Sequence, residues 1–210
     1  NTKKSREQKL LNEKLVKFCE DNFHDGKSIL SKLYEYKKIL IKENEFMNLI
    51  GKSTIDDLDQ RHLLDCIQIF KYLPNQDKSL MDIGTGAGLP GIIMSIIGFK
   101  NLHLVEKSPK KSFFLENCKL RLGLNYMVHN KSITEMSDIN VDCITARAFA
   151  SIEKIIFITK KIINKQTKFI LLKGRSYLTE LETINPEKYY WKTYPSITSN
   201  ESKIIIMGTK

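Results

Sequence analysis

The first 75 residues carry the apolar spacing of amphipathic helices. Apolar side chains recur every three or four residues from Leu11 to Cys19 and again from Ile29 to Leu40, which places them on one face of each predicted helix. Ser53 and Asp56 are typical of a capping pair, and they predict a third helix that runs toward Pro74. Residues 1–75 are therefore expected to form an N-terminal helical extension.

The pattern changes after residue 75, where short apolar runs alternate with amphipathic stretches of helix length. This alternation predicts βαβ units, and hence an α/β fold with a parallel sheet and helices on both faces. We expect residues 76–210 to form one compact domain. The predicted strands are 79–83, 102–105, 141–146 and 169–172, the predicted helices are roughly 90–98, 109–123 and 152–163, and a weaker pair of runs, 189–194 and 203–207, predicts a terminal antiparallel hairpin.

Composition places the chain among globular proteins. Of its 210 residues, 41% are hydrophobic and 28% are charged, and no apolar run approaches the length of about 18 residues that a membrane span needs. The segment that begins at Asn1 is polar and lacks the apolar core of a signal peptide. We therefore expect a cytoplasmic protein, a monomer, with no membrane partner.

The cysteines and histidines are too scattered to indicate a metal site. No CxxC pair and no HxxxH spacing occurs, so we predict no metal and expect buried thiols in a reducing compartment. The residues are Cys19, Cys66, Cys118 and Cys143, with His24, His62, His103 and His129.

The net charge of +10 is concentrated in the second half of the chain. Between Lys154 and Arg175 there are seven basic residues and no acidic residue. The positive electrostatic potential of such a stretch favours a polyanionic partner such as a nucleic acid. A compositional origin also stays open, because a chain rich in Lys, Ile and Asn is typical of AT-biased coding.

The most informative segment joins a predicted strand to a predicted helix through three glycines at alternate positions. The strand Leu80–Ile83 is followed by Gly84, Gly86 and Gly88, and then by Leu89-Pro90-Gly91. Glycines let the backbone turn sharply and approach a ligand closely, and proline suits the first turn of a helix. The segment therefore predicts a nucleotide-type cofactor site.

Two acidic residues bear on which cofactor binds. Dinucleotides and S-adenosylmethionine are both held by a strand, a glycine loop and a helix. Asp82 favours S-adenosylmethionine, because a carboxylate attracts the cationic amino acid end of that cofactor and would repel a pyrophosphate. Glu106 ends the next strand, where a carboxylate accepts the ribose hydroxyls of either cofactor. We predict S-adenosylmethionine, with a dinucleotide as the less favoured alternative.

Several motifs resemble those of a known family. They are Asn48–Ile50, Arg61–Asp65, Asp82–Gly91, Lys110–Leu115, Arg147–Ala150 and Leu172–Gly174. Their order, with Gly-Leu-Pro-Gly and Arg-Ala-Phe-Ala, resembles the bacterial small-subunit rRNA guanine-N7 methyltransferases, also called glucose-inhibited division protein B. The resemblance covers about residues 46–175.

This resemblance implies a fold, a reaction and a set of contacts. The fold would be a class I SAM-dependent methyltransferase, Rossmann-like, with a mostly parallel seven-stranded sheet and an N-terminal helical extension. The implied substrate is the guanine N7 in the 530 loop of 16S rRNA, in the small ribosomal subunit. The resemblance places cofactor contacts at Gly84, Leu89, Ile133, Thr134 and Arg147, to which the residues themselves add Asp82, Gly86, Gly88 and Glu106.

The chemistry of the implied acceptor agrees with what the sequence lacks. Guanine N7 is an exposed lone pair with no proton, so orientation and exclusion of water can carry the reaction. Amino-group methylation normally shows an Asn/Asp-Pro-Pro-aromatic motif where this chain has Thr145–Phe149. Carbon-5 methylation needs a nucleophilic cysteine, and Cys143 lies within a predicted buried strand.

Arg147 is the predicted catalytic residue. It follows the predicted strand 141–146, at the sheet edge where ligands bind, and it can contact the cofactor or brace the target base. A helix-cap or surface ion-pair arginine is the alternative. Phe149 either stacks on the guanine or belongs to the core.

Basic residues at the same edge are predicted to contact RNA phosphates. Arg61 lies on the third predicted helix, where it either forms a salt bridge with Asp65 or helps to order Arg147 and the RNA. The other predicted RNA contacts are Lys107, Lys110, Lys111, Lys173 and Arg175.

Three other functions stay open from the sequence alone. One is a SAM-dependent small-molecule methyltransferase, which the basic edge disfavours. The second is a nicotinamide-dependent oxidoreductase, which Asp82 disfavours. The third is a non-catalytic RNA-binding assembly factor that keeps the glycine loop without transferring a methyl group.

Overall fold

The N-terminal part is helical, as predicted, up to residue 44. The computed structural model describes residues 11–210, so the first ten residues of the predicted helical extension lie outside the described residues. The first two described helices are α2 (Glu13–Asn22) and α3 (Gly26–Asn44). Asn12 caps α2, because its side chain accepts a hydrogen bond from the backbone N–H of Lys14.

The third predicted helix has a different start and a different form. The prediction that Ser53 and Asp56 cap this helix was wrong, because Lys52–Thr54 forms a separate 3-10 turn. In this turn the Thr54 hydroxyl donates to the Gly51 carbonyl oxygen. The helical stretch begins only at Asp59. It consists of a π-helical turn (Asp59–Leu64), a short α4 (Asp65–Ile67) and a 3-10 turn (Gln68–Tyr72).

The seven strands form one mostly parallel sheet, which confirms the predicted architecture. The order is β3-β2-β1-β4-β5-β7-β6, and only β7 is reversed, running antiparallel to both of its neighbours, β5 and β6. The predicted terminal hairpin is therefore confirmed, whereas β3 corresponds to none of the predicted apolar runs. The strands are β1 (Leu80–Ile83), β2 (Leu102–Val105), β3 (Met127–His129), β4 (Cys143–Arg147), β5 (Lys168–Lys173), β6 (Tyr189–Pro195) and β7 (Lys203–Thr209).

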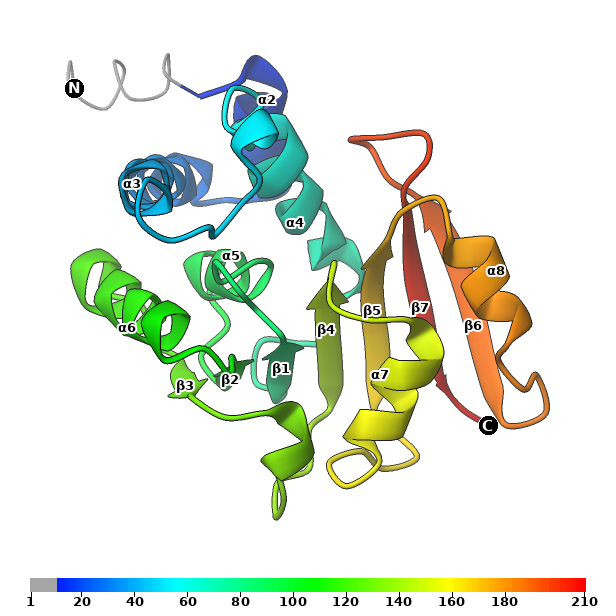
Figure 1. Cartoon of the computed structure of the whole chain (residues 1–210). Helices are drawn as coiled ribbons and strands as arrows, with labels where there is room; N and C mark the ends of the chain where they lie inside the picture. Colours follow the sequence, from blue (N-terminus) through cyan, green and yellow to red (C-terminus); the bar gives the residue numbers. More distant parts are fainter. Residues whose placement is uncertain (1–10) are drawn as a thin grey trace.

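Helices cover both faces of this sheet (Figure 1). Because side chains alternate along a strand, Leu80 packs with α2, α3, α5 (Gly91–Ile96) and α6 (Pro109–Leu122) on one face. Met81 and Ile83 point to the other face, toward α7 (Ile152–Thr159) and α8 (Tyr177–Glu182). Strands buried on both faces explain why the central segments are continuous apolar runs.

The N-terminal helices hold the glycine loop at the carboxyl ends of the parallel strands. Tyr36 of α3 is fully buried, and its hydroxyl donates a 2.6 Å hydrogen bond to the carbonyl oxygen of Ala87. The helical part therefore restrains the loop that follows β1. Within residues 11–210, no helix is both long and apolar enough to cross a membrane.

Tyr36→Phe tests this restraint. We expect it to lower the free energy of unfolding by about 1–2 kcal/mol, because the buried carbonyl of Ala87 loses its side-chain donor. Urea unfolding measures the change. Tyr190→Phe is the matched control, since Tyr190 is exposed and its hydroxyl makes no hydrogen bond with the described residues. Equal losses in both variants would contradict the role of Tyr36.

Candidate active site

A cavity of about 630 Å³ opens at the carboxyl ends of β1, β2 and β4. The glycine loop after Ile83, the residues after Val105 and the residues from Arg147 to Phe149 form its walls on the sheet. The N-terminal part contributes Leu49, Ile50 and His62. In open α/β sheets ligands bind at this edge, so the two parts of the chain complete one candidate site.

Asp82 lies beneath the glycine loop and does not line the cavity. It is fully buried, and its carboxylate accepts hydrogen bonds from the backbone N–H of Gly91 at 2.9 Å, from the Thr145 hydroxyl at 2.9 Å and from the Thr85 hydroxyl. These contacts join β1, β4 and the start of α5. The geometry therefore supports a role in shaping the loop and not the expected direct contact with a cofactor.

The burial of Asp82 also changes its acidity. Desolvation raises the pKa of this carboxyl group to about 6, although the hydrogen bonds from Thr85, Gly91 and Thr145 act in the opposite direction. Asp82 therefore titrates just below neutral pH, which an exposed aspartate does not.

Gly84 and Gly86 line the cavity; they share a backbone conformation that favours glycine but differ in what lies above them. Both have left-handed backbone conformations, with φ of 62° and 59°. A Cβ on Gly84 would lie only 1.9 Å from Cδ2 of Phe149, whereas a Cβ on Gly86 would meet nothing nearer than 3.9 Å. The Phe149 ring therefore rests directly on Gly84, and the surface over Gly86 is open for a ligand.

Glu106 connects the glycine loop to the end of β2. Its Oε2 accepts from the backbone N–H of Gly86 at 3.0 Å, and its Oε1 accepts from the backbone N–H of Ser108 at 2.8 Å. A carboxylate has about four acceptor positions, so two remain for ligand hydroxyls. Glu106 lines the cavity, which fits the predicted contact with a ribose.

The remaining predicted cofactor residues divide between the cavity and the core. Leu89, Ile133 and Thr134 line the cavity, where Leu89 and Ile133 give it apolar surface. Gly88 does not line it and lies against Ile92 and Leu115 instead. Apolar walls, a carboxylate at one end and an open glycine loop fit a nucleoside cofactor such as S-adenosylmethionine.

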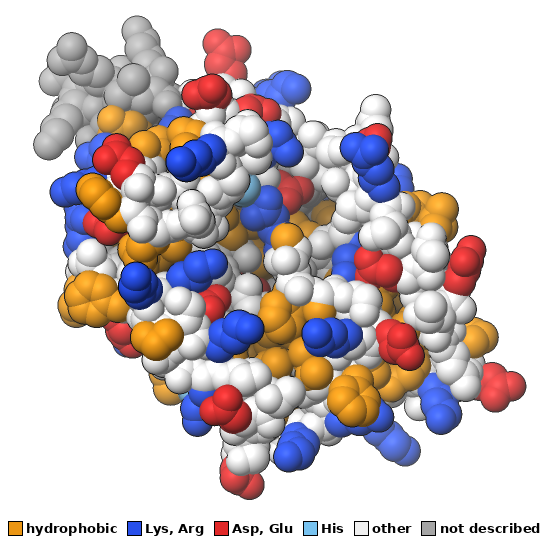
Figure 2. All heavy atoms as spheres, viewed as in Figure 1, with side chains coloured by type: hydrophobic (Ala, Val, Ile, Leu, Met, Phe, Trp, Pro, Cys, Tyr) orange, Lys and Arg blue, Asp and Glu red, His pale blue; other side chains and the backbone are white. Residues whose placement is uncertain are grey.

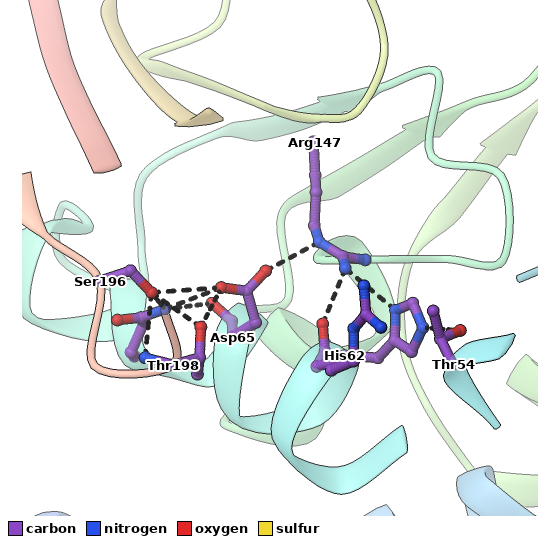
Figure 3. Close-up of polar contacts among 8 residues, drawn as sticks. Thr54, His62, Asp65, Arg147, Ser196 and Thr198 are labelled. Carbon is purple, nitrogen blue, oxygen red and sulfur yellow. Dashed lines mark hydrogen bonds and ion pairs between the residues drawn. The ribbon is translucent and has the colours of Figure 1, made fainter. Parts of the chain in front are cut away.

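Arg147 is held by the π-helical turn and by Asp65 at the start of α4 (Figure 3). Its Nε donates to Oδ2 of Asp65 at 3.0 Å, and its Nη2 donates to the carbonyl oxygen of Arg61 at 2.9 Å and to Nδ1 of His62 at 3.0 Å. Asp65 thus pairs with Arg147 and not with Arg61, so the predicted salt bridge within the helix was wrong. The alternative, that this turn orders Arg147, agrees with the structure.

His62 is a neutral acceptor in this cluster. Burial, together with the cations Arg147 and Arg61, lowers the pKa of His62 to about 4. Since an arginine can only donate, Nδ1 of His62 accepts, and its protonated Nε2 donates to the Thr54 hydroxyl at 2.7 Å. The lone pair that could act as a base is therefore occupied by Arg147.

Asp65 also anchors the turn between β6 and β7. Its Oδ1 accepts from the Thr198 hydroxyl at 2.8 Å and from the Gln68 side-chain amide at 3.1 Å. Gln68 donates in addition to the Ser196 hydroxyl, and it accepts from the backbone N–H of Ile197. One carboxylate therefore links the hairpin, the helical part and Arg147 (Figure 3).

The predicted RNA contacts fall into two groups. Lys107 and Lys111 line the cavity together with Lys131 and Lys154, and none of the four forms an ion pair with another residue in the range 11–210. Figure 2 shows Lys and Arg side chains around the middle of the molecular surface that faces the viewer. These four lysines, called here the rim lysines, form a cationic border to the cavity.

The second group lies outside the cavity or is already paired. Lys173 is 10% exposed, and its ammonium group lies 2.7 Å from Oε2 of Glu180. Arg175 pairs with Glu201 at 3.1 Å, although both side chains are exposed. Arg61 and Lys110 are exposed and do not line the cavity. A phosphate contact by Lys173 would require its ion pair to break, so the structure does not favour it.

Sequence reasoning missed Lys131 and Lys154 as site residues. Lys131 follows β3, whose three residues form no apolar run, so the strand and its carboxyl end gave no signal. In the sequence Lys154 is only the first residue of a basic stretch, and nothing there places the first turn of α7 beside the glycine loop. In the described part of the chain, no group of three or more His, Cys, Asp or Glu side chains could hold a metal ion.

Comparison with known proteins gives consistent results. A family model described as rRNA small subunit methyltransferase G (GidB) matches residues 29–200. The ribosomal RNA small subunit methyltransferase G of Rickettsia rickettsii (strain Sheila Smith) is 38% identical over 180 residues, which cover 85% of this chain and 93% of the relative. That of Rickettsia bellii (strain OSU 85-389) is 37% identical over 179 residues, which cover 84% and 92%.

Solved structures are similar in fold at low sequence identity. The ribosomal protein L11 methylase from Lactobacillus delbrueckii subsp. bulgaricus has a TM-score of 0.58 and 17% identity, covering 77% of this chain and 81% of its own. A mutant of MtNAS in complex with S-adenosylmethionine has a TM-score of 0.55 and 14% identity, covering 88% and 77%. These similarities confirm the predicted class I methyltransferase fold.

Gly84→Ala and Gly86→Ala separate backbone strain from the contact with Phe149. Both introduce a side chain at positive φ, at a cost of about 1–2 kcal/mol. Only Gly84→Ala also displaces the Phe149 ring, so we expect it to lower the free energy of unfolding further. In a Phe149→Ala background the two substitutions should cost the same by urea unfolding. A difference that persists there would contradict the proposed contact.

The raised pKa of Asp82 predicts a pH dependence that Asp82→Asn removes. The folded protein keeps a proton on Asp82 up to about pH 6, whereas the unfolded chain releases it near pH 4, so folding binds protons between these values. The stability of the wild type relative to Asp82→Asn should therefore fall by about 2 kcal/mol from pH 4 to 6. Urea unfolding across this range measures it, and a constant or rising relative stability contradicts the assignment.

Proposed function

Because the chain belongs to the rRNA small subunit methyltransferase G (GidB) family, we propose that it transfers a methyl group from S-adenosylmethionine to N7 of a guanine. The proposed guanine lies in the 530 loop of 16S rRNA, within the small ribosomal subunit, and the enzyme acts as a cytoplasmic monomer. One observation carries the proposal: a cavity of about 630 Å³ that fits a nucleoside cofactor is bordered by the rim lysines. The cavity suits the donor, and its border suits a polyanionic acceptor.

Different residues of the cavity are proposed to bind different parts of the methyl donor. We assign the ribose hydroxyls to the free acceptor positions of Glu106 and the adenine to the apolar walls at Leu89 and Ile133, beside Thr134. Gly84 and Gly86 bring the backbone of the loop close to the amino acid end. Asp82 and Gly88 support the loop from beneath. When bound, S-adenosylmethionine supplies a methyl group on a positively charged sulfur.

Arg147 is the residue proposed to act at the reacting end. Its guanidinium borders the cavity and is fixed by Asp65, Arg61 and His62, so it offers a positively charged group in one set orientation. Guanine N7 has no proton to lose, and the site has no need of a base. The occupied lone pair of His62 agrees with this chemistry.

We propose that the rim lysines hold the RNA through its phosphates. Lys107 and Lys111 were predicted from their place after β2, and Lys131 and Lys154 complete the border. Lys110 is exposed next to Lys111, and Arg61 is exposed next to His62, which lines the cavity, so both can add to the same field. Arg175 and Lys173 contribute less, because Glu201 and Glu180 neutralise them. Phosphate contacts of this kind position a substrate without reading its sequence.

Transfer of labelled methyl from S-adenosylmethionine tests the function. Small ribosomal subunits that lack their native methylations are the acceptor, with naked 16S rRNA and a reaction without RNA beside them, and the labelled nucleotide is then mapped. We expect label at a guanine N7 in the 530 loop. Label at another atom or another loop, or none on either RNA, would overturn the proposed acceptor.

Lys111→Gln combined with Lys131→Gln tests the rim lysines. We expect weaker RNA binding and a salt dependence whose slope of log K against log salt falls by about 1.5, because two phosphate contacts are lost. Lys161→Gln with Lys165→Gln is the matched control, since both lysines are exposed and precede β5 at the opposite edge of the sheet. Equal slopes for the two double variants would contradict the assignment.

A further inference from the structure

A second cavity, of about 410 Å³, adjoins the cofactor cavity. The two cavities share Arg147, Ala148 and Phe149 and no other residue. The second cavity extends from there toward Lys173 at the end of β5 and Ser196 at the turn between β6 and β7. Apart from Arg147, no residue proposed to hold the cofactor lines this second cavity.

The partition between the cavities is a short strained segment. Ala148 has a left-handed backbone with φ of 48°, which is uncommon for a residue other than glycine and concentrates at functional sites. The next side chain, Phe149, rests on Gly84 and is 38% exposed. An aromatic ring that borders both cavities offers a face on which a planar base can stack.

The charges of the second cavity leave one cation unmatched. Asp65 is paired with Arg147, and Glu180 is paired with Lys173 at 2.7 Å. Lys203, which also lines the cavity at the start of β7, forms no ion pair among the described residues. A cavity whose acids are neutralised internally and whose remaining charge is positive suits an anionic ligand.

The two carboxylates of the cavity also keep acceptor positions. Among residues 11–210, Oδ2 of Asp65 accepts only from Arg147, and Oε1 of Glu180 accepts only from the Ser176 hydroxyl. Burial acts to raise the pKa of Glu180, but the hydrogen bond and charge of Lys173 together with hydrogen bonds from Ser176 and the Ile152 backbone lower it overall, so this carboxylate stays ionised and accepts. Guanine carries two donors, N1–H and N2–H, on the ring remote from N7, whereas adenine has no N1–H.

We propose that the second cavity is the pocket for the acceptor nucleotide. In it the guanine stacks on Phe149, offers N1–H and N2–H to Glu180 and Asp65, and turns N7 toward the cofactor cavity, while Lys203 contacts a phosphate. This inference rests on the proposed function, which it deepens by naming the residues that recognise guanine.

Steady-state methyl transfer to small subunits tests the phosphate contact. We expect Lys203→Gln to raise KM for the subunit about tenfold, with unchanged cofactor affinity by calorimetry, because one charge-assisted contact is lost. Lys188→Gln is the matched control, since Lys188 is exposed at the other end of the same hairpin. Equal KM values for the two variants would overturn the assignment of Lys203.

Phe149 is tested by comparing two replacements. Phe149→Tyr keeps the aromatic face and should keep transfer, whereas Phe149→Leu should lower kcat/KM about tenfold through lost stacking. Equal kcat/KM for the two variants would overturn the role of the ring.

Binding of free nucleotides tests the pocket without methyl transfer. Guanosine 5′-monophosphate and adenosine 5′-monophosphate are titrated into the full chain with S-adenosylhomocysteine present, and backbone amide NMR signals are followed. We expect guanosine monophosphate to shift Phe149, Lys173 and Lys203 and to bind more tightly than adenosine monophosphate. Equal affinities, or shifts elsewhere only, overturn the pocket even if 16S rRNA is methylated. Guanosine-selective shifts without rRNA methylation support the pocket and overturn the proposed acceptor.

Discussion

The rest of the site depends on the partners of one guanidinium group, that of Arg147. A largely buried cation is tolerated only where charges and hydrogen bonds replace water. Asp65, His62 and the carbonyl oxygen of Arg61 supply them; Arg61 and His62 belong to the π-helical turn, and Asp65 begins α4 directly after it. Because Asp65 also holds the turn between β6 and β7, the helical part, the centre of the sheet and its antiparallel edge meet at Arg147. The N-terminal helices are therefore part of the site.

The acidic residues around the cavity serve mainly to fix its backbone. Asp82 joins the glycine loop to β4, Glu106 joins it to β2, and Asp65 and Glu180 each neutralise one cation. These carboxylates and the neutral His62 all make structural contacts, and none is placed as a base. Such a site suits an acceptor atom that already has a lone pair, where orientation is the main requirement.

Much of the fold followed from the sequence, because strands buried on both faces are apolar runs and the glycine loop is a local motif. The capping pair at Ser53 failed because Thr54 bonds backward to Gly51, and β3 was missed because three residues form no run. The partners of Arg147 and Lys173 could not be assigned from spacing alone. Arg147 and Asp65 lie 82 residues apart, and the buried position of Asp82 depends on a strand 63 residues away.

A double-mutant cycle between Arg147 and Asp65 tests most directly whether this ion pair organises the site. The free energy of unfolding is measured by urea for the wild type, Arg147→Gln, Asp65→Asn and the double variant. The account predicts that the double variant is more stable than the sum of the single losses implies, by at least about 1 kcal/mol, since each single change leaves a partner uncompensated. Losses that add within about 0.5 kcal/mol would contradict it.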